Sequence, residues 1–197
     1  ANMNMIIALT FLGILTVAFA ESPPKKECLN LEGKQNFEPQ KYFKGNWYLS
    51  HIHHASPPSA ICQASKLELL DDGSVQKKTY VYEELGGVTE FIPVNCTGTL
   101  NTEKAKVSFQ CQHLENSEVK HFSMEGTVLE TDYDNFSVYY VCVKDTEYLE
   151  NYMVASRQKD VEPTDPRIAE TLKKLGYSFD KFVARKNVVC KDHPDFN

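Results

Sequence analysis

The sequence lacks several features that mark common classes of protein. Beyond residue 20, the 197-residue chain has no apolar run long enough to cross a membrane. Its 21 Lys and Arg residues are scattered among 27 Asp and Glu residues, which gives a net charge of −6. Binding of nucleic acid needs a concentrated basic face. Membrane proteins and nucleic-acid-binding proteins are therefore both disfavoured.

Motifs of catalysis and metal binding are missing as well. The chain has no nucleophile elbow, no HExxH motif and no phosphate-binding glycine loop, so we expect that it is not an enzyme. No two cysteines have the CxxC spacing of a zinc knuckle. There is also no obvious internal repeat, so we expect one domain and not an array.

The first twenty residues differ from the rest. Met5 to Ala20 is almost entirely apolar and ends in the small-x-small sequence Ala18-Phe19-Ala20, which predicts a secretory signal peptide (residues 1–20) cleaved before Glu21. One departure is that no Lys or Arg precedes the apolar run. We expect residues 21–197 to form a single secreted, soluble domain.

All six cysteines lie in this predicted mature part: Cys28, Cys62, Cys96, Cys111, Cys142 and Cys190. An even number behind a signal peptide predicts three disulfides in an oxidising compartment. Six cysteines allow about 15 pairings, among which the sequence does not choose. A link between Cys96 and Cys111 is supported by their positions, because they flank one short turn.

Strand-like segments dominate the middle of the chain. Val, Ile, Tyr and Phe alternate with polar residues in short runs, separated by turn signals such as Asp71-Asp72-Gly73 and Gly86-Gly87. The predicted strands are residues 46–52, 66–70, 74–83, 88–94, 96–100, 106–112, 119–130, 136–144 and 151–157. Gly126 within one of them predicts a bend.

Near the C-terminus the spacing of apolar residues changes from that of a strand to that of a helix. Ile168, Leu172 and Leu175 are spaced as on one face of a helix, with Asp165 suited to the N-cap and Pro166 to the first helical position. We therefore predict an all-β fold, an eight-stranded antiparallel up-and-down barrel with one C-terminal α-helix. An open β-sandwich is the alternative. A barrel of this size has room for one small ligand.

Several stretches resemble one family. Gly45-x-Trp47, within the string from Lys41 to Tyr48, is similar to the first strand of the triabin and nitrophorin group. These are salivary lipocalins (calycin superfamily) of blood-feeding triatomine bugs. Residues 140–142, 148–154 and 179–182 and the signal-like segment resemble the same group. The resemblance implies a lipocalin barrel in which Trp47 closes the floor.

The resemblance also implies a disulfide pattern. Cys28 would pair with Cys142, and Cys62 with Cys190, which leaves Cys96 for Cys111. The third pair fits the non-haem, triabin-like side of the group. In the nitrophorins a strand histidine between two tyrosines holds haem. The equivalent stretch here is Tyr80-Val81-Tyr82, and valine cannot coordinate iron, so no cofactor is expected.

Three histidines, His51, His53 and His54, lie at the end of the first predicted strand and the start of the following loop. The favoured interpretation is that they are polar residues of a loop at the barrel mouth. A contact with ligand from His51 or His53 is the second, because both share a strand face with Trp47. A metal site is the least favoured, because His53 and His54 point in opposite directions on a strand.

The candidate ligand-contacting residues are alternating strand residues and the two loop histidines. They are His51, His53, Tyr80, Tyr82, Phe109, Phe122, Met124 and Tyr139. A wall rich in tyrosine would suit an aromatic or amphiphilic ligand. Asn95 and Asn135 begin Asn-x-Thr and Asn-x-Ser sequences, so both are candidate glycosylation sites.

These observations predict a secreted, monomeric binding protein that acts without turnover. By resemblance it would sequester a host biogenic amine, an eicosanoid or ADP, and so inhibit platelet aggregation and vasoconstriction. The acidic net charge favours an amine or a neutral lipid over a nucleotide. The alternatives are a surface inhibitor of a coagulation or contact-phase protease, a haem and nitric oxide carrier, and an allergen-like lipocalin without a ligand.

Overall fold

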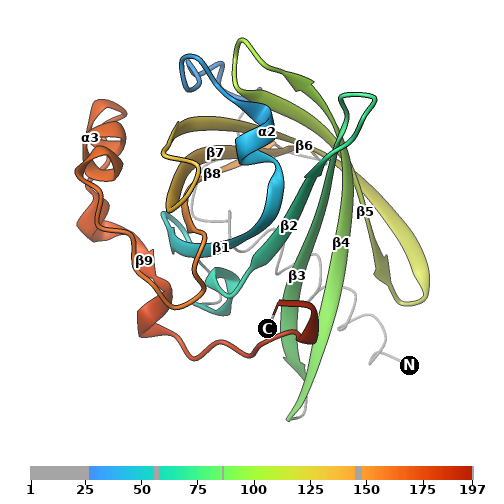
Figure 1. The fold of residues 1–197 in the computed structure, drawn as a ribbon. Coiled ribbons are helices and arrows are strands. Elements are labelled where there is room, and N and C mark those ends of the chain that lie inside the picture. Colours follow the sequence, from blue (N-terminus) through green and yellow to red (C-terminus); the bar gives the residue numbers. More distant parts are fainter. Residues whose placement is uncertain (1–26, 56–57, 86, 145–147, 197) are drawn as a thin grey trace.

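Eight antiparallel strands close into a barrel in the computed structural model, which describes residues 27–55, 58–85, 87–144 and 148–196 (Figure 1). The strands are β1 (Lys44–Ile52), β2 (Ala64–Leu69), β3 (Val75–Leu85), β4 (Val88–Asn101), β5 (Lys106–Glu115), β6 (Glu118–Thr131), β7 (Phe136–Lys144) and β8 (Tyr148–Ser156). Each pairs with the next, and β1 pairs with both β2 and β8. The barrel is confirmed and the open sandwich is wrong. The predicted signal peptide lies outside the described residues.

Two details of the strands differ from prediction. Residues 88–94 and 96–100 belong to one continuous strand, β4, because Asn95 keeps its register with both Lys78 and Gln112. In β6 the irregularity falls between Val128 and Glu130, not at Gly126. Leu129 is the extra residue there, since a bulge places two residues opposite one.

The C-terminal helix is confirmed in position and capping. Helix α3 (Pro166–Lys174) begins after Asp165, whose carboxylate accepts a hydrogen bond from the Arg167 backbone N–H at 2.9 Å. Ile168 and Leu172 are fully buried, and with residues of β7 and β8 they form a second core on the outside of the barrel. A short helix, α2 (Pro39–Tyr42), precedes β1.

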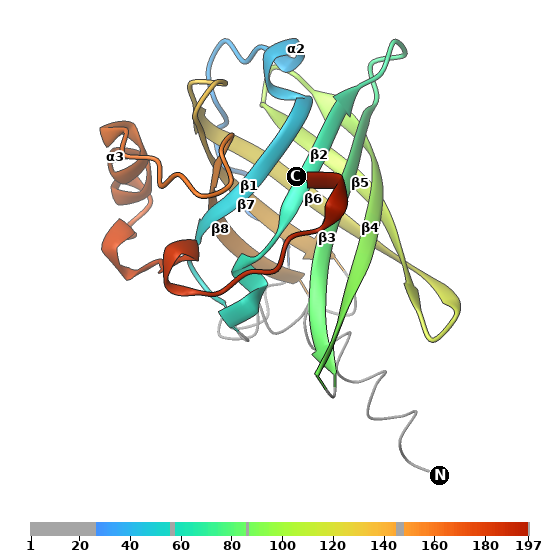
Figure 2. The ribbon, with the colours of Figure 1, turned by 60° about the horizontal axis from the view of Figure 1, so that its bottom comes forward.

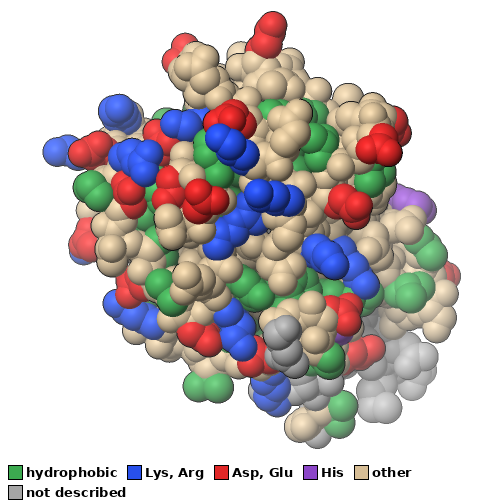
Figure 3. Space-filling view, viewed as in Figure 1, with side chains coloured by type: hydrophobic (Ala, Val, Ile, Leu, Met, Phe, Trp, Pro, Cys, Tyr) green, Lys and Arg blue, Asp and Glu red, His purple; other side chains and the backbone are tan. Residues whose placement is uncertain are grey.

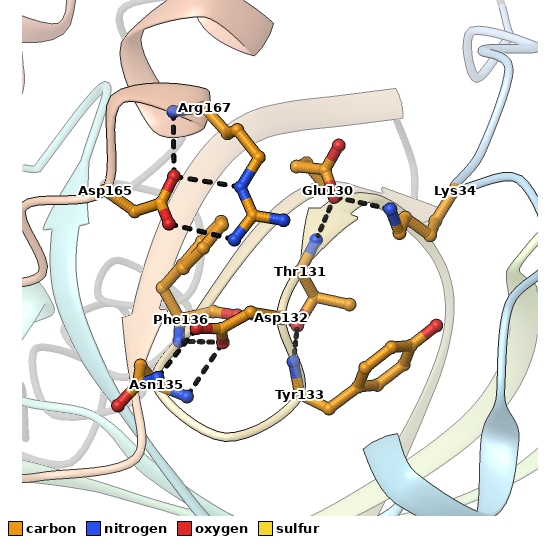
Figure 4. A network of polar contacts seen from close by, with 9 residues as sticks. All are labelled: Lys34, Glu130, Thr131, Asp132, Tyr133, Asn135, Phe136, Asp165 and Arg167. Carbon is orange, nitrogen blue, oxygen red and sulfur yellow. Dashed lines mark hydrogen bonds and ion pairs between the residues drawn. The ribbon is translucent and has the colours of Figure 1, made fainter.

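Polar contacts gather at the end of the barrel where β6 turns into β7 (Figure 4). Asp132 accepts hydrogen bonds from the backbone N–H groups of Asn135 and Phe136 at 2.8 and 3.0 Å. Lys34 of the N-terminal segment pairs with Glu130 at 2.7 Å. The Asp132 contacts close the turn, and the Lys34–Glu130 pair holds the N-terminal segment against this end, which α2 also covers.

The chain after α3 wraps the outside of the barrel (Figure 2). It contains the two-residue strand β9 (Val183–Ala184), which pairs with β1, and three short 3-10 turns at Phe179–Lys181, Arg185–Asn187 and Pro194–Phe196. Phe196 packs against Tyr48 and Tyr80 on the outer face. The tail therefore covers apolar side chains that would otherwise face water.

All three disulfides that the resemblance implies are present. Cys28–Cys142 ties the N-terminal segment to β7, and Cys62–Cys190 ties the segment before β2 to the tail. Cys96–Cys111 joins β4 to β5. Among the described residues, no helix is both long and apolar enough to span a membrane. On the face seen in Figure 3, acidic and basic side chains are interspersed.

Candidate functional site

A cavity lies inside the barrel, along the inward faces of the strands. The volume of the cavity is about 110 Å³. The empty space is about 1210 Å³ when the opening toward solvent is included. Most of the wall is aliphatic or aromatic. The residues that line it include Tyr42, Phe43, Trp47, Leu49, Gln63, Ser65, Leu67, Lys77, Thr79, Val81, Val94, Val107, Phe109, Phe122, Met124, Thr127, Tyr139, Val141 and Met153.

The floor of the cavity is built around Trp47. The indole is 4% exposed, and its N–H donates to the Tyr42 carbonyl at 3.2 Å. The Arg157 guanidinium lies 3.7 Å from the ring centroid, close enough for a cation–π contact. Gly45, two residues earlier, has a φ of +65°, a conformation that disfavours any side chain. The first strand thus places a rigid aromatic plug at the closed end.

Two glycines make room on one wall. A Cβ at Gly98 would lie 2.7 Å from the Phe109 ring and 2.4 Å from the Val107 side chain. Gly98 therefore lets Phe109 lie flat against β4. Gly126, on the other side of Phe109, is different, because a Cβ there would meet only the Phe109 ring, at 3.9 Å. The space beside Gly126 belongs to the cavity.

Lys77 is the one charged side chain among the described residues that line the cavity. It points inward from β3 with its ammonium 5.8 Å from the Phe109 ring centroid. Burial alone lowers the pKa of Lys77 from 10.5 to about 8, because an apolar surrounding disfavours the charged form. The side chain is half-buried by its exposed area and lines the cavity. The described wall therefore carries one cation and no counter-ion.

Two tyrosines add polar groups to the wall. The Tyr42 hydroxyl is hydrogen-bonded to the Ser137 hydroxyl at 2.8 Å, and burial raises the pKa of Tyr42 to about 12. Burial also raises the pKa of Tyr139, with a smaller contribution from Tyr42. Both phenols stay neutral at physiological pH, so each is a polar, uncharged group on the cavity wall.

The structure separates the predicted ligand-contacting residues into two groups. Phe109, Phe122, Met124 and Tyr139 line the cavity. Tyr80 and Tyr82 do not, because successive residues of a strand face opposite sides, and here Val81 faces inward.

Tyr80 instead stacks on His193 at 3.7 Å and donates to Asp195 at 2.6 Å. Tyr82 donates to the Val189 carbonyl at 3.1 Å. The prediction for these two tyrosines placed them on the wrong face, since the C-terminal tail buries them outside the barrel.

The predicted ligand contacts from His51 and His53 are also misplaced. A register shift between Leu49 and His51 interrupts the alternation of β1, so His51 does not share the inward face of Trp47. Its ring is buried in a groove outside the barrel, where Nε2 lies 3.0 Å from Glu162 and Nδ1 lies 3.1 Å from the Ser50 hydroxyl.

His53 packs against the chain that follows α3. Its ring centroid lies 4.6 Å from that of Tyr177 and 5.1 Å from that of Phe182. His51, within β1, and His53, just after it, therefore hold the C-terminal segment to the barrel. Among residues 27–55, 58–85, 87–144 and 148–196, no group of His, Cys, Asp or Glu side chains is arranged to hold a metal ion.

Val81 occupies the place that the resemblance assigns to a haem ligand. Its side chain lines the cavity and has no atom that can coordinate iron. The described wall also contains no histidine. The residues present therefore do not fit a histidine-ligated haem.

Sequence reasoning missed Lys77, although a signal for it existed. Once Val81 is taken to face inward, the alternation of β3 also turns Thr79, Lys77 and Val75 inward. Tyr80 and Tyr82 were instead predicted as ligand-contacting residues because they are aromatic, and this assigned the wrong face of β3 to the cavity.

The candidate glycosylation sites lie on the surface. Asn95 is exposed in β4, between Lys78 and Gln112 of the neighbouring strands. Asn135 is exposed in the β6–β7 turn, where its side-chain amide donates to Asp132 at 2.7 Å. Whether either carries sugar stays a prediction.

A closed eight-stranded antiparallel barrel with an internal cavity and one outer helix is the lipocalin fold. A family model described as Nitrophorin matches residues 28–196. Triafestin-2 from Triatoma infestans is 32% identical over 196 residues, which cover 95% of this chain and 93% of that relative. The chain belongs to the Nitrophorin family.

Two solved structures share the fold. The tryptamine complex of the amine binding protein of Rhodnius prolixus matches with a TM-score of 0.72 and 16% identity, over 86% of this chain and 92% of that one. A variant of LTBP1 in complex with leukotriene C4 matches with a TM-score of 0.57 and 23% identity, over 79% of this chain and 92% of that one.

Proposed function

We propose that this protein is a secreted salivary lipocalin that sequesters a small host mediator in its barrel, and that the mediator is an anionic amphiphile of the eicosanoid class. Capture of such a mediator would inhibit platelet aggregation and vasoconstriction. The protein would act as a monomer by mass action, without turnover. The observation that carries the proposal is Lys77, a lone cation in an apolar cavity.

The charge of the cavity selects among the candidate ligands. A carboxylate would pair with Lys77, and its hydrocarbon chain would lie against Phe109, Phe122 and Met124. An amine would bring a second positive charge to a wall whose described residues include no acid. Glu115 is buried at the mouth end of β5 but is not part of that wall. ADP carries several negative charges, which one lysine does not balance.

The size of the cavity sets a further condition. A volume of about 110 Å³ is smaller than the 300 to 1,000 Å³ (roughly) of typical ligand sites. A long-chain ligand must therefore extend into the mouth or displace side chains. Met124 and Met153 line the wall, and methionine repacks readily because it is unbranched and flexible. The LTBP1 complex with leukotriene C4 supports the use of this fold for such ligands.

Titration calorimetry of the oxidised protein tests the proposal. The ligands are arachidonic acid, its methyl ester, a thromboxane analogue, serotonin, noradrenaline and ADP. We expect the acid to bind about ten to a hundred times more tightly than the ester, since a hydrogen bond to a charged group contributes about 1.5–3 kcal/mol. Equal binding of acid and ester, or tighter binding of an amine, would reject the anionic class.

The second candidate is an inhibitor of a coagulation or contact-phase protease that uses the outer surface. Leu114 and Val119 pair across the outer face of the β5–β6 hairpin and are 58% and 54% exposed. Large exposed apolar side chains of this kind can mark a protein contact. Clotting and contact-activation assays with a Leu114→Ser, Val119→Ser double variant would identify this function by a loss of inhibition.

A further inference from the structure

The chemistry of Lys77 extends beyond charge pairing. It is the one lysine among the described residues of the cavity wall. The neighbouring residue, Lys78, points to the outer face, where its ammonium lies 4.9 Å from the Tyr80 ring centroid and 3.6 Å from Asp195. Adjacent lysines on opposite faces thus provide one amine enclosed by apolar side chains and one beside a carboxylate.

The two environments change the availability of the free amine. Burial lowers the pKa of Lys77 to about 8, whereas hydrogen bonding to Tyr80 is the main cause that raises the pKa of Lys78. At pH 7.4 about one fifth of an amine with a pKa of 8 is neutral, against about one in a thousand at 10.5. Desolvation in an apolar pocket is a recognised way to make a lysine nucleophilic.

We propose that Lys77 captures long-chain aldehydes covalently, as an imine inside the barrel. The inference rests on the proposed function, since the barrel must admit an amphiphile. It goes further by naming a reaction and a second class of ligand. The substrate class is an aldehyde with an unbranched or polyunsaturated hydrocarbon chain, which the apolar wall would bury.

The reaction balances without any further reagent. The neutral Lys77 nitrogen attacks the carbonyl carbon and forms a carbon–nitrogen bond, giving a carbinolamine. The nitrogen then loses its proton, the hydroxyl group leaves with a proton as water, and a carbon–nitrogen double bond remains. No oxidant or reductant takes part, so capture is reversible. An apolar wall favours the product, because the water needed for hydrolysis is poorly solvated there.

The test uses the oxidised full-length secreted protein and dodecanal, a saturated aldehyde that reacts with amines only at its carbonyl. Equimolar dodecanal is added in the presence of cyanoborohydride, which reduces an imine to a stable secondary amine. Intact mass then counts dodecyl groups per chain, and peptide mapping locates them. We expect one group per chain, on Lys77, and slower labelling when dodecanoic acid competes for the cavity.

Two variants serve as a matched pair. Lys77→Arg keeps a positive charge but has no amine that forms the imine, so labelling should fall at least tenfold. Lys78→Arg, on the outer face, should label like the wild type. The wild type should be labelled faster at pH 7.4 than at pH 6, because the neutral fraction of the Lys77 amine rises over that range.

Labelling spread over surface lysines or confined to the N-terminal amine would overturn the proposal, as would labelling that persists in Lys77→Arg. If that variant does not fold, the peptide map of the wild type decides alone. Arachidonic acid that binds the wild type while dodecanal gives no adduct at Lys77 rejects the imine and leaves the proposed function standing. If instead dodecanal forms an adduct at Lys77 but arachidonic acid binds no more tightly than its ester, the imine stands and the proposed anionic ligand class is rejected.

Discussion

Replacing Lys77 by methionine is expected to stabilise the protein while it weakens binding of an anionic ligand. The side chain is surrounded by apolar residues, with Phe109 the aromatic ring near its ammonium. Methionine is similar in length, unbranched and apolar, so it can fill the same space without the cost of a buried charge. Stability and ligand affinity should therefore move in opposite directions.

The size of the stability gain follows from the pKa of Lys77. A fall from 10.5 to about 8 corresponds to about 3 kcal/mol, at about 1.4 kcal/mol for each pKa unit. Part of the side-chain surface faces the cavity, where water can solvate the ammonium. We therefore expect Lys77→Met to raise the free energy of unfolding by about 1–3 kcal/mol at pH 7.

The gain must depend on pH with a definite sign. In the folded protein Lys77 loses its proton near pH 8, whereas in the unfolded chain it does so near 10.5. Between these values the unfolded state binds more protons, so the wild type becomes more stable as pH rises. The advantage of Lys77→Met should be complete below pH 8 and should shrink as pH rises toward 10.5.

Denaturant unfolding at pH 7 and at pH 10, with the disulfides intact, measures both effects. Lys66→Met is the matched control, because Lys66 is exposed on the neighbouring strand and pairs with Lys78 across it. A surface change of that kind should alter stability by less than about 0.5 kcal/mol. If Lys77→Met were no more stable than the wild type at pH 7, or if its advantage were unchanged at pH 10, Lys77 would not be a buried cation.

Four further predictions follow from the cavity, the capping of α3 and the pKa of Lys77. Gly126→Leu should fill the cavity, because a Cβ there meets only Phe109 at 3.9 Å, and should reduce arachidonate affinity in calorimetry with little change in Tm. Gly98→Ala should instead destabilise the fold by about 1–3 kcal/mol in denaturant, since its Cβ would lie 2.7 Å from Phe109, and an unchanged midpoint would contradict this packing. Hydrogen bonds from Arg167 lower the pKa of Asp165 to about 2, so Asp165→Ala should speed amide hydrogen exchange in α3 above that pH, with the difference vanishing as pH falls through about 2. Arachidonate affinity should fall by up to about tenfold per pH unit as pH rises above about 8, because the carboxylate prefers protonated Lys77; a flat profile would exclude the ion pair.

Local signals predicted the fold because each acts within a few residues. Asp165 and Pro166 fix the start of α3 through a hydrogen bond and a preset φ, and both lie beside the helix that they begin. The turn between Asp71 and Gly73 likewise separates β2 from β3 as expected. Alternation within short strands predicted an antiparallel β fold, with the closed barrel as the favoured form and the open sandwich as the alternative.

The placement of site residues failed where a distant segment or a bulge intervened. Tyr80 has the composition of an inward residue, yet it is buried outside because Phe196 and His193 cover it from far along the chain. His51 does not face the same side of β1 as Trp47, because one register shift interrupts the strand. A shift of one residue reverses the direction of every side chain beyond it. Neither the tail nor the bulge has a signal in the local pattern.

Net charge and the cavity wall favour different ligands. The chain carries a net charge of −6, and its acids lie largely on the surface, where they interleave with lysines (Figure 3). A field from exposed charges is screened by solvent within about 8–10 Å, whereas a ligand in the barrel meets Lys77 in an apolar surrounding. Under the proposed function, the charge of one half-buried side chain selects the ligands that the cavity favours. An unpaired buried cation lowers stability in the free protein, and a bound carboxylate would offset that cost. The presence of lysine at a position where methionine should be more stable is the physical argument that Lys77 serves binding.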